Sequence, residues 1–192
     1  MSSPLASAIV GLCSTESTER SLAGVEIHRQ GRILAEEATC AWWSDPALSA
    51  LLGSEPAITV GLAVEPATFA RIREANGGPR LADIPPDQDA REFELHFPGN
   101  IALDVLTTRE PGGAGAIARY LSKFGEGIQQ VEYRCADVDR ATVLLKEKFA
   151  LLPVYPRAHS GADGTRINFF LMPTSAGGKV LIELYEVPDQ YR

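Results

Sequence analysis

The sequence is poor in the residues that build disulfide frameworks and zinc sites. Its three cysteines, Cys13, Cys40 and Cys135, are scattered over 192 residues and include no CxxC pair. Its three histidines form no HxxH or HExxH spacing, and none stands in a Cys–His arrangement. The sequence therefore disfavours a disulfide framework, a zinc knuckle, zinc hydrolysis and cysteine catalysis.

Long apolar runs and an excess of positive charge are also missing. No apolar run approaches the ~20 residues that a membrane span needs, and the opening MSSPLASAIVGLC lacks the basic start of a signal peptide. With 18 Lys and Arg against 25 Asp and Glu, the net charge is −7, which disfavours nucleic acid and anionic membranes as partners. We therefore expect a cytoplasmic protein that acts on a small molecule. A polyanionic substrate such as a coenzyme A thioester would need a local cationic patch.

From residue 57 onward, apolar and polar residues follow one order of strands and helices twice. In the first pass, alternation predicts strands over 58–64, 91–97 and 101–106, a helix from Pro66 to about Asn76, and a weaker strand over 80–84. In the second pass, strands are predicted over 131–135, 152–155, 167–171 and 180–185, with a helix from Asp137 or Asp139 to about Phe149, a polar loop over 159–164 and a turn over 175–178. A short helix over 116–124, closed by Gly125, joins the two passes. Residues 57–110 and 128–187 therefore look like a duplicated βαβββ unit.

This duplication predicts an α+β fold of two βαβββ modules around a cleft. We place the first module and linker helix at 57–124 and the second module at 125–192. Residues 1–56 do not fit the repeat and form an N-terminal extension that is expected to cover a sheet edge or a dimer face. Within it, Val25–Glu36 is predicted as a hairpin about Gln30–Gly31, and a short helix is predicted over 44–52. Exposed module edges favour a homodimer.

Strand parity selects the candidate site residues. If the apolar strand faces pack on helices, the opposite faces line the cleft. Those faces carry Asp104, Gln130, Glu132, Arg134, Glu183 and Tyr185, with Glu92, Glu94 and His96 on a neighbouring strand. Alternating charges are equally typical of a solvated sheet face, so solvation stays an alternative. His96 has both a structural and a catalytic interpretation.

A glycine-rich stretch lies between the two modules. Gly112–Gly115 precedes a helix but lacks the Gly-Lys-Ser/Thr of a P-loop, and a flexible connector is the simplest interpretation. The start of this helix could still receive a phosphate, with Arg109, Arg119 and Lys123 nearby.

Several stretches carry a family resemblance. IARYLSKFGEGIQQVEYRCADVDRATVLLKEK, followed by GADG, FFLMP and GGKVLIELYE, resembles methylmalonyl-CoA epimerases and, more broadly, the vicinal oxygen chelate superfamily. The resemblance is good over residues 101–187, fair over 57–100 and absent over 1–56. It implies a half-open barrel of two βαβββ modules around a divalent metal, with ligands from the first and last strand of each module.

The resemblance implies Asp104, Gln130 and Glu183 as metal ligands. Gln130, Asp163 and Met172 stand where the family has histidines, and the fourth ligand position falls on Thr59, a poor ligand. An oxygen-only set favours Mg²⁺ or Mn²⁺ over Zn²⁺, and Co²⁺ is a further candidate. Because the imidazoles are missing, a site without a metal stays an open alternative. With or without a metal, Thr59, Glu94 and Tyr185 are expected to line the substrate cleft.

The resemblance implies an epimerase or isomerase that moves a proton next to a carbonyl, such as that of an acyl-thioester. Two opposed carboxylates in a desolvated cleft suit this task, and Glu183 with Asp104 or Glu132 is the favoured pair. Arg134 would hold the oxyanion in the absence of a metal. Two alternatives stay open: a metal-free cyclase or lyase of secondary metabolism, and a drug-sequestering binding protein.

Overall fold

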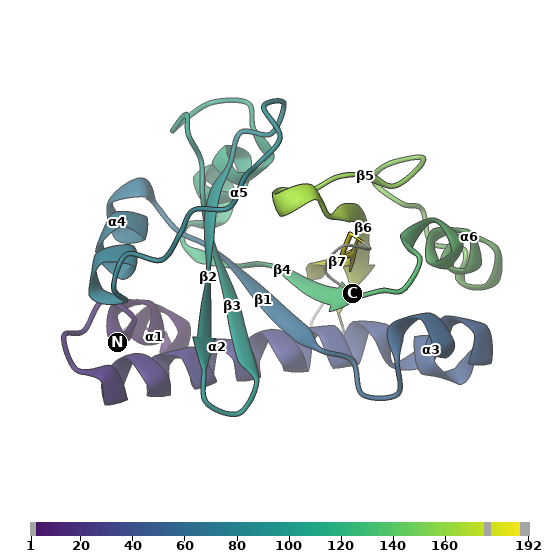
Figure 1. The fold of residues 1–192 in the computed structure, drawn as a ribbon, viewed down its shortest axis with the longest axis horizontal. Coiled ribbons are helices and arrows are strands. Elements are labelled where there is room, and N and C mark those ends of the chain that lie inside the picture. Colours follow the sequence, from purple (N-terminus) through teal and green to yellow (C-terminus); the bar gives the residue numbers. More distant parts are fainter. Residues whose placement is uncertain (1–2, 175–177, 189–192) are drawn as a thin grey trace. The chain divides into compact units, whose positions relative to one another are not determined.

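The computed structural model describes residues 3–174 and 178–188 (Figure 1). By its internal contacts the chain divides into two compact units, residues 1–31 with 59–129 and residues 32–58 with 130–192. Each unit contains most of one half of the duplication together with part of the N-terminal segment. Both units mix helices with a sheet, as the predicted α+β class requires.

The first unit is built on the strands β2 (Arg91–Phe97), β3 (Ile101–Thr107) and β1 (Ile58–Ala63), in that order across the sheet. β3 is antiparallel to β2 and parallel to β1. The unit also contains α1 (Pro4–Gly11), the first part of α2 (Ser17–Thr39), α4 (Pro66–Ala75) and α5 (Ala116–Phe124). In Figure 1, α1 and α4 lie to one side of the strands, and α4 and α5 both pack on β3.

Local sequence explains these elements. In β2, Phe93 and Leu95 are buried whereas the alternating Glu94 and His96 are not, which is the pattern of a sheet with one apolar face. Pro66 is the first residue of α4, where its missing N–H costs no hydrogen bond. These predictions from the sequence are confirmed.

The second unit is built on most of β4 (Gly127–Arg134), then β7 (Lys179–Glu186), β6 (Arg166–Pro173) and the short β5 (His159–Ser160), in that order. β4 and β7 are parallel, and the other neighbouring pairs are antiparallel. The unit also contains the 3-10 helices η1 (Cys40–Ser44) and η2 (Ala162–Gly164), and the helices α3 (Pro46–Leu52) and α6 (Val138–Phe149). α6 packs on β6, β7 and α3. Asp137 rather than Asp139 caps α6, since its side chain accepts a hydrogen bond from the backbone of Arg140.

An aromatic cluster forms the core of the second unit. Trp42, Tyr133 and Phe170 are fully buried, and the Trp42 ring lies 6.3 Å from Tyr133 and 6.2 Å from Phe170 between centroids. Aromatic pairs at this spacing contribute about 0.5–1.5 kcal/mol beyond area burial. The Tyr133 hydroxyl lies 3.1 Å from Thr39 Oγ1, and burial raises the pKa of this phenol. The N-terminal segment therefore supplies core residues to this unit.

The predicted hairpin at Val25–Glu36 is wrong, because these residues belong to helix α2. Gly31 makes no turn. It lets the helix approach β1 so closely that an added Cβ would lie 2.6 Å from the side chain of Val60. The ion pairs Glu26–Arg29 and Arg32–Glu36 have the spacing that stabilises a helix, and they were the overlooked signal.

Two short predicted strands are also absent. Residues 80–84 form no strand, although the Ala82 N–H donates to the Glu92 carbonyl at 3.0 Å. Residues 152–155 make one isolated bridge, between Pro153 and Phe170. Prolines flank the first segment and interrupt the second, and proline cannot donate to a ladder. The predicted loop over 159–164 contains β5 and η2 instead. The turn predicted over 175–178 falls mostly on residues 175–177, which lie outside the described residues.

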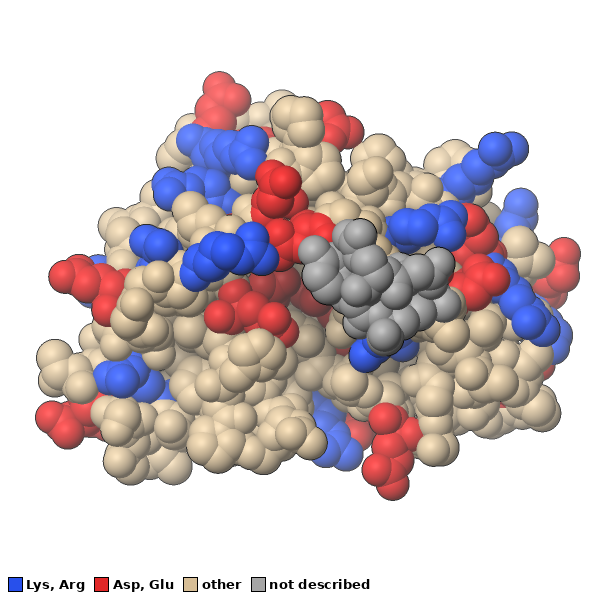
Figure 2. Space-filling view, viewed as in Figure 1, with Lys and Arg blue, Asp and Glu red and all other residues tan. Residues whose placement is uncertain are grey.

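The surface carries charged side chains of both signs (Figure 2). Figure 2 shows acidic and basic side chains interspersed on one face. Within the described ranges, no helix has the length and apolar character needed to cross a membrane. Cys13, Cys40 and Cys135 are free thiols.

Candidate functional site

Two carboxylates and one amide meet on adjacent strands of the second unit. Glu132 on β4 is in register with Glu183 on β7, so both side chains leave the same face of the sheet. Gln130, two residues before Glu132, shares this face. Its Nε2 donates to Glu183 Oε2 at 2.6 Å and to Glu132 Oε1 at 3.0 Å. One amide group thus holds two carboxylates in place.

All three side chains of this cluster are buried, with 7–8% of each residue exposed. A buried carboxylate is costly unless it is hydrogen-bonded, and bonds to charged acceptors are stronger than bonds between neutral groups. Only the NH2 end of Gln130 can donate to a carboxylate, so these two bonds determine the orientation of the amide. Its NH2 group therefore stabilises both buried carboxylates at this place.

Arg134 and Tyr185 continue the same face of the sheet. They are the next register pair after Glu132 and Glu183. Arg134 is exposed at the end of β4 and forms no ion pair among the residues that the structure describes. Parity from the sequence therefore placed Gln130, Glu132, Glu183, Arg134 and Tyr185 correctly on one face of this unit.

The remaining candidates belong to the first unit. Asp104 on β3 is in register with Gly61 of β1 and with Glu94 of β2, so Asp104 and Glu94 share a sheet face. His96 Nε2 lies 3.2 Å from Glu94 Oε2, and its side chain is 70% exposed. Thr59 is buried on β1. A catalytic role for His96, and metal or substrate roles for the others, stay predictions.

A divalent metal is the cofactor that the resemblance implies, so the donor set must be tested against it. Among the described residues, no group of three or more His, Cys, Asp or Glu side chains could hold a metal ion. The Gln130 cluster has two carboxylates, but the amide presents its NH2, which cannot ligate a cation, to both of them. As arranged, Gln130 and Glu183 of the implied ligand set, with Glu132 beside them, do not fit a divalent metal. The implied metal role of Asp104 stays a prediction.

Sequence reasoning missed an aromatic group beside this cluster. Phe169 of β6 is in register with Glu183, which places it on the same face. The Tyr155 ring lies 6.0 Å from Phe169 and 4.7 Å from His159 between centroids. The alternation of side chains along β6 was the sequence signal that could have predicted Phe169 on the face that carries Glu183. Apolar rings beside Glu183 favour a ligand with an uncharged portion.

Cys135 follows Arg134 and has the surroundings of a structural thiol rather than of a nucleophile. It is 3% exposed, and burial raises the pKa of its thiol to about 11. Because the thiolate is the reactive form, a thiol of this kind is inert at neutral pH.

Comparisons with known proteins agree with this architecture. No family model matches the chain, and no curated protein matches it. Among solved structures, the methylmalonyl-CoA epimerase from Mycobacterium tuberculosis is similar, with a TM-score of 0.58, 32% identity, 73% of this chain and 93% of that chain covered. A Streptomyces coelicolor methylmalonyl-CoA epimerase in complex with 2-nitronate-propionyl-CoA has a TM-score of 0.52 and 25% identity, covering 67% and 94%. A methylmalonyl-CoA epimerase in complex with methylmalonyl-CoA and NH4+ has a TM-score of 0.53 and 25% identity, covering 68% and 93%.

These matches confirm the fold class that the duplication and the sequence motifs predicted. The match to the Mycobacterium tuberculosis epimerase includes 93% of that chain, and its 32% identity shows common descent. The chain therefore belongs to the vicinal oxygen chelate superfamily.

Proposed function

We propose that this protein is an epimerase- or isomerase-type enzyme that moves a proton at the carbon next to a carbonyl group. One observation carries the proposal: Glu132 and Glu183 are buried side by side on one sheet face and share the Gln130 amide. The similarity to methylmalonyl-CoA epimerases supports an acyl-thioester as the substrate class.

The two carboxylates divide the work of an acid and a base. Epimerisation removes a proton from one face of a carbon and returns a proton to the other face. One carboxylate in its ionised form takes the α-proton, which leaves an enolate, and the other in its protonated form returns a proton to the same carbon. Gln130 is a positioning residue, because it contacts both carboxylates through one rigid amide plane.

Arg134 is the proposed partner of the oxyanion. Arg134 belongs to the same face of the sheet, in the register pair that follows Glu132 and Glu183. A cation placed at the developing enolate oxygen would stabilise the negative charge of the enolate. We assign this role to Arg134 because the Gln130 cluster does not fit a divalent metal.

The experiment is solvent deuterium exchange with methylmalonyl-CoA as the probe substrate. Each epimer is incubated separately in deuterium oxide with wild type, Glu132→Gln and Glu183→Gln, and label at the α-carbon is followed by mass spectrometry. We expect each variant to lose epimerisation by about 100-fold or more, the scale of a lost acid or base. If the carboxylates serve opposite faces, each variant keeps exchange from only one epimer.

Glu147→Gln is the matched control, since Glu147 is an exposed residue on α6 away from the cluster. It should exchange and epimerise like wild type. Full exchange and full turnover in both Glu132→Gln and Glu183→Gln would contradict the proposal. Tight binding of the probe by wild type without any exchange would favour the binding-protein alternative instead.

A further inference from the structure

The sheet face that carries Glu132 and Glu183 continues as an apolar surface. Gln130 is in register with Leu181 of β7, and Leu181 is in register with Leu171 of β6. Residues in register, and alternate residues along one strand, have side chains on the same face. Leu181 and Leu171 therefore form the next row of this face after the two carboxylates.

Phe169 joins this surface from the row of the carboxylates. It is in register with Glu183, and Leu171 is the next residue of β6 on the same face. We call Phe169, Leu171 and Leu181 the apolar wall. All three residues belong to the second unit, as Glu132 and Glu183 do. The wall and the carboxylates are thus parts of one compact unit.

The apolar wall is open, unlike the other face of the same sheet. Leu171 is 52% exposed, and Phe169 and Leu181 are half-buried. On the other face, Asn168 Nδ2 donates to Thr142 Oγ1 of α6 at 3.3 Å, so α6 covers that face. The residues of β6 and β7 on the covered face are buried: Asn168, Phe170, Met172, Val180, Ile182 and Leu184. Exposed apolar surface on this sheet therefore lies on the face of the candidate site.

The segment at the outer edge of β6 widens the wall. Pro153 forms an isolated antiparallel bridge with Phe170, and the Val154 N–H donates to the Phe169 carbonyl at 2.8 Å. Side chains alternate along a paired segment, so Leu152 and Val154 are on the side of the wall. Both are exposed. They extend the apolar surface beyond β6.

Distances along the sheet separate the wall from the place of proton transfer. Leu181 is two residues from Glu183 on β7, about 7 Å along the strand, and Leu171 is the diagonal neighbour of Glu183 at about 7–8 Å. With C–C bonds of about 1.5 Å, a methyl group on a carbon held over Glu183 stops short of both leucines. An alkyl chain of about four to six carbons, or a phenyl ring, reaches them.

The wall also has a far end. Lys179 is the next residue of β7 on this face after Leu181, and it is exposed and in register with Pro173. It is four residues from Glu183, about 14 Å along the strand. An ammonium group at that position favours an apolar ligand group of moderate length over a long lipid chain.

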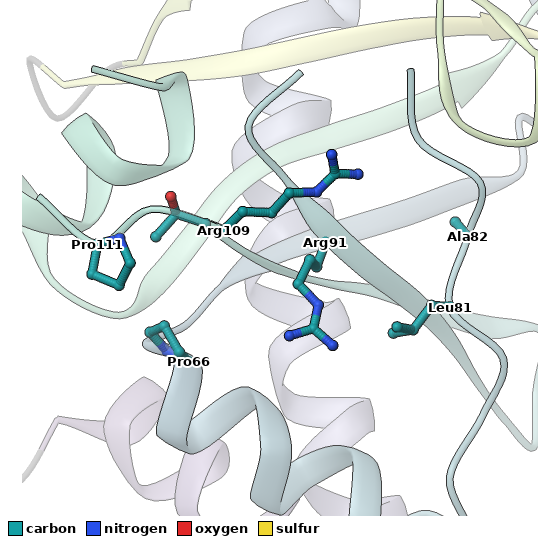
Figure 3. A pocket seen from close by; sticks show the side chains of 7 residues that line it. Pro66, Leu81, Ala82, Arg91, Arg109 and Pro111 are labelled. Carbon is teal, nitrogen blue, oxygen red and sulfur yellow. The ribbon is translucent and has the colours of Figure 1, made fainter. Parts of the chain in front are cut away.

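Two cavities elsewhere are lined by charged side chains and suit an apolar group less well. The cavity of about 500 Å³ in the first unit contains the side chains of Arg91 and Arg109 (Figure 3). A cavity of about 570 Å³ in the second unit is lined by charged residues of both signs: Asp137, Asp139, Arg140, Arg166 and Glu186. The apolar wall is thus the better surface for a hydrocarbon group.

We propose that the α-carbon of the substrate carries an apolar group of about four to six carbons, alkyl or aromatic, which packs on the apolar wall. This inference rests on the proposed function, since it places the α-carbon over Glu132 and Glu183. The substrate therefore differs from methylmalonyl-CoA, the ligand of one similar structure, whose α-carbon carries a methyl group. Burial of the added methylene groups supplies the preference.

The test is solvent deuterium exchange at the α-carbon of methylmalonyl-CoA and pentylmalonyl-CoA, with the full-length protein. The two thioesters differ only in the α-substituent, so the acidity of the proton and the coenzyme A portion are matched. We expect kcat/KM for exchange to be about tenfold or more higher for pentylmalonyl-CoA, the discrimination that about one methylene group gives in an apolar pocket.

Leu171→Gln should lower the ratio of pentyl to methyl exchange by about fivefold or more, because it makes the centre of the wall polar. Val143→Gln is the matched control. Val143 is 50% exposed, close to the value for Leu171, but it lies on α6, which covers the other face of the sheet. Val143→Gln should keep the wild-type ratio.

The outcomes separate this inference from the proposed function. Equal exchange of the two thioesters, or a ratio that Leu171→Gln leaves unchanged, would overturn the role of the wall while proton transfer stands. If neither thioester exchanges, proton transfer fails, and calorimetric titration with the same two compounds decides the role of the wall. Binding of pentylmalonyl-CoA that is about tenfold tighter, and weaker in Leu171→Gln, supports the wall, whereas equal binding overturns it.

Sedimentation analysis tests a second copy of the chain as the occupant of the wall. A dimeric wild type that becomes monomeric in Leu171→Gln, with an unchanged ratio of exchange, would assign Leu171 to a contact between copies and overturn the proposal. An unchanged sedimentation mass together with the lowered ratio supports it.

Discussion

Gln130→Met is the substitution that tests the shared-amide arrangement most sharply. Methionine keeps the length and approximate volume of glutamine but removes both N–H donors. Gln130 makes two hydrogen bonds to buried carboxylates, and a bond to a charged group contributes about 1.5–3 kcal/mol. Since water can enter and replace part of this interaction, we expect the free energy of unfolding to fall by about 2–4 kcal/mol.

Gln129→Met is the matched control, one residue earlier on the same strand. The Gln129 Oε1 is buried without a hydrogen-bond partner among the described residues. Replacing an unsatisfied buried acceptor with an apolar group removes a cost rather than a bond, so this variant should be neutral or slightly more stable. The two substitutions are chemically identical, and only the tertiary environment separates their expected effects.

The free energy of unfolding of both variants is measured by urea unfolding with tryptophan fluorescence as the signal. Trp42 and Trp43 report on the cluster because they lie in the same unit. Deuterium exchange into methylmalonyl-CoA gives the functional readout, which should fall for Gln130→Met and persist for Gln129→Met. A loss of less than about 1 kcal/mol in Gln130→Met, or equal losses in the two variants, would refute the reasoning, since one lost charged bond alone exceeds that value.

Three further predictions concern packing, pH and metal. Gly31→Ala should destabilise the protein by about 1–3 kcal/mol in urea unfolding through overpacking against Val60, and adding Val60→Ala should restore part of the loss; a stabilised single variant would contradict this. Burial raises the pKa of the Cys135 thiol from 9.0 in the unfolded chain to about 11 in the folded protein. As the pH rises, the unfolded state therefore ionises first. The contribution of this thiol to the free energy of unfolding is complete below pH 9 and falls by about 2–3 kcal/mol between pH 9 and pH 11. Cys135→Ala should flatten that part of the pH profile, and an unchanged profile would count against the assignment. Proton exchange should survive dialysis against a chelator, because Gln130 presents N–H groups rather than oxygen to Glu132 and Glu183; a loss that Mn²⁺ or Mg²⁺ restores would show the opposite.

The elements that follow local rules could be predicted from the sequence alone. Alternation in REFELHF predicted β2, and the Gly125 stop predicted the end of α5. Helix α2 was predicted wrongly, although its pairs Glu26–Arg29 and Arg32–Glu36 have helical spacing. Its Gly31 is typical of a turn in sequence, and only the close approach to Val60 explains it within a helix. A glycine that permits contact and a glycine that permits a turn are identical in sequence, because the difference lies in a residue far along the chain.

In the candidate site too, the sequence predicts which residues share a sheet face, whereas only the fold shows which atoms are hydrogen-bonded. Period-two alternation determines which side chains share a sheet face, and this was enough to group Glu132 with Glu183. Alternation does not state register between distant strands, so the shared amide of Gln130 could be found only from the folded chain. The apolar wall likewise needs the register of β6 and β7, because strand pairing decides that Leu171 and Leu181 form the row next to the carboxylates. Local periodicity is a property of the chain, whereas the partner of each buried polar atom is a property of the fold.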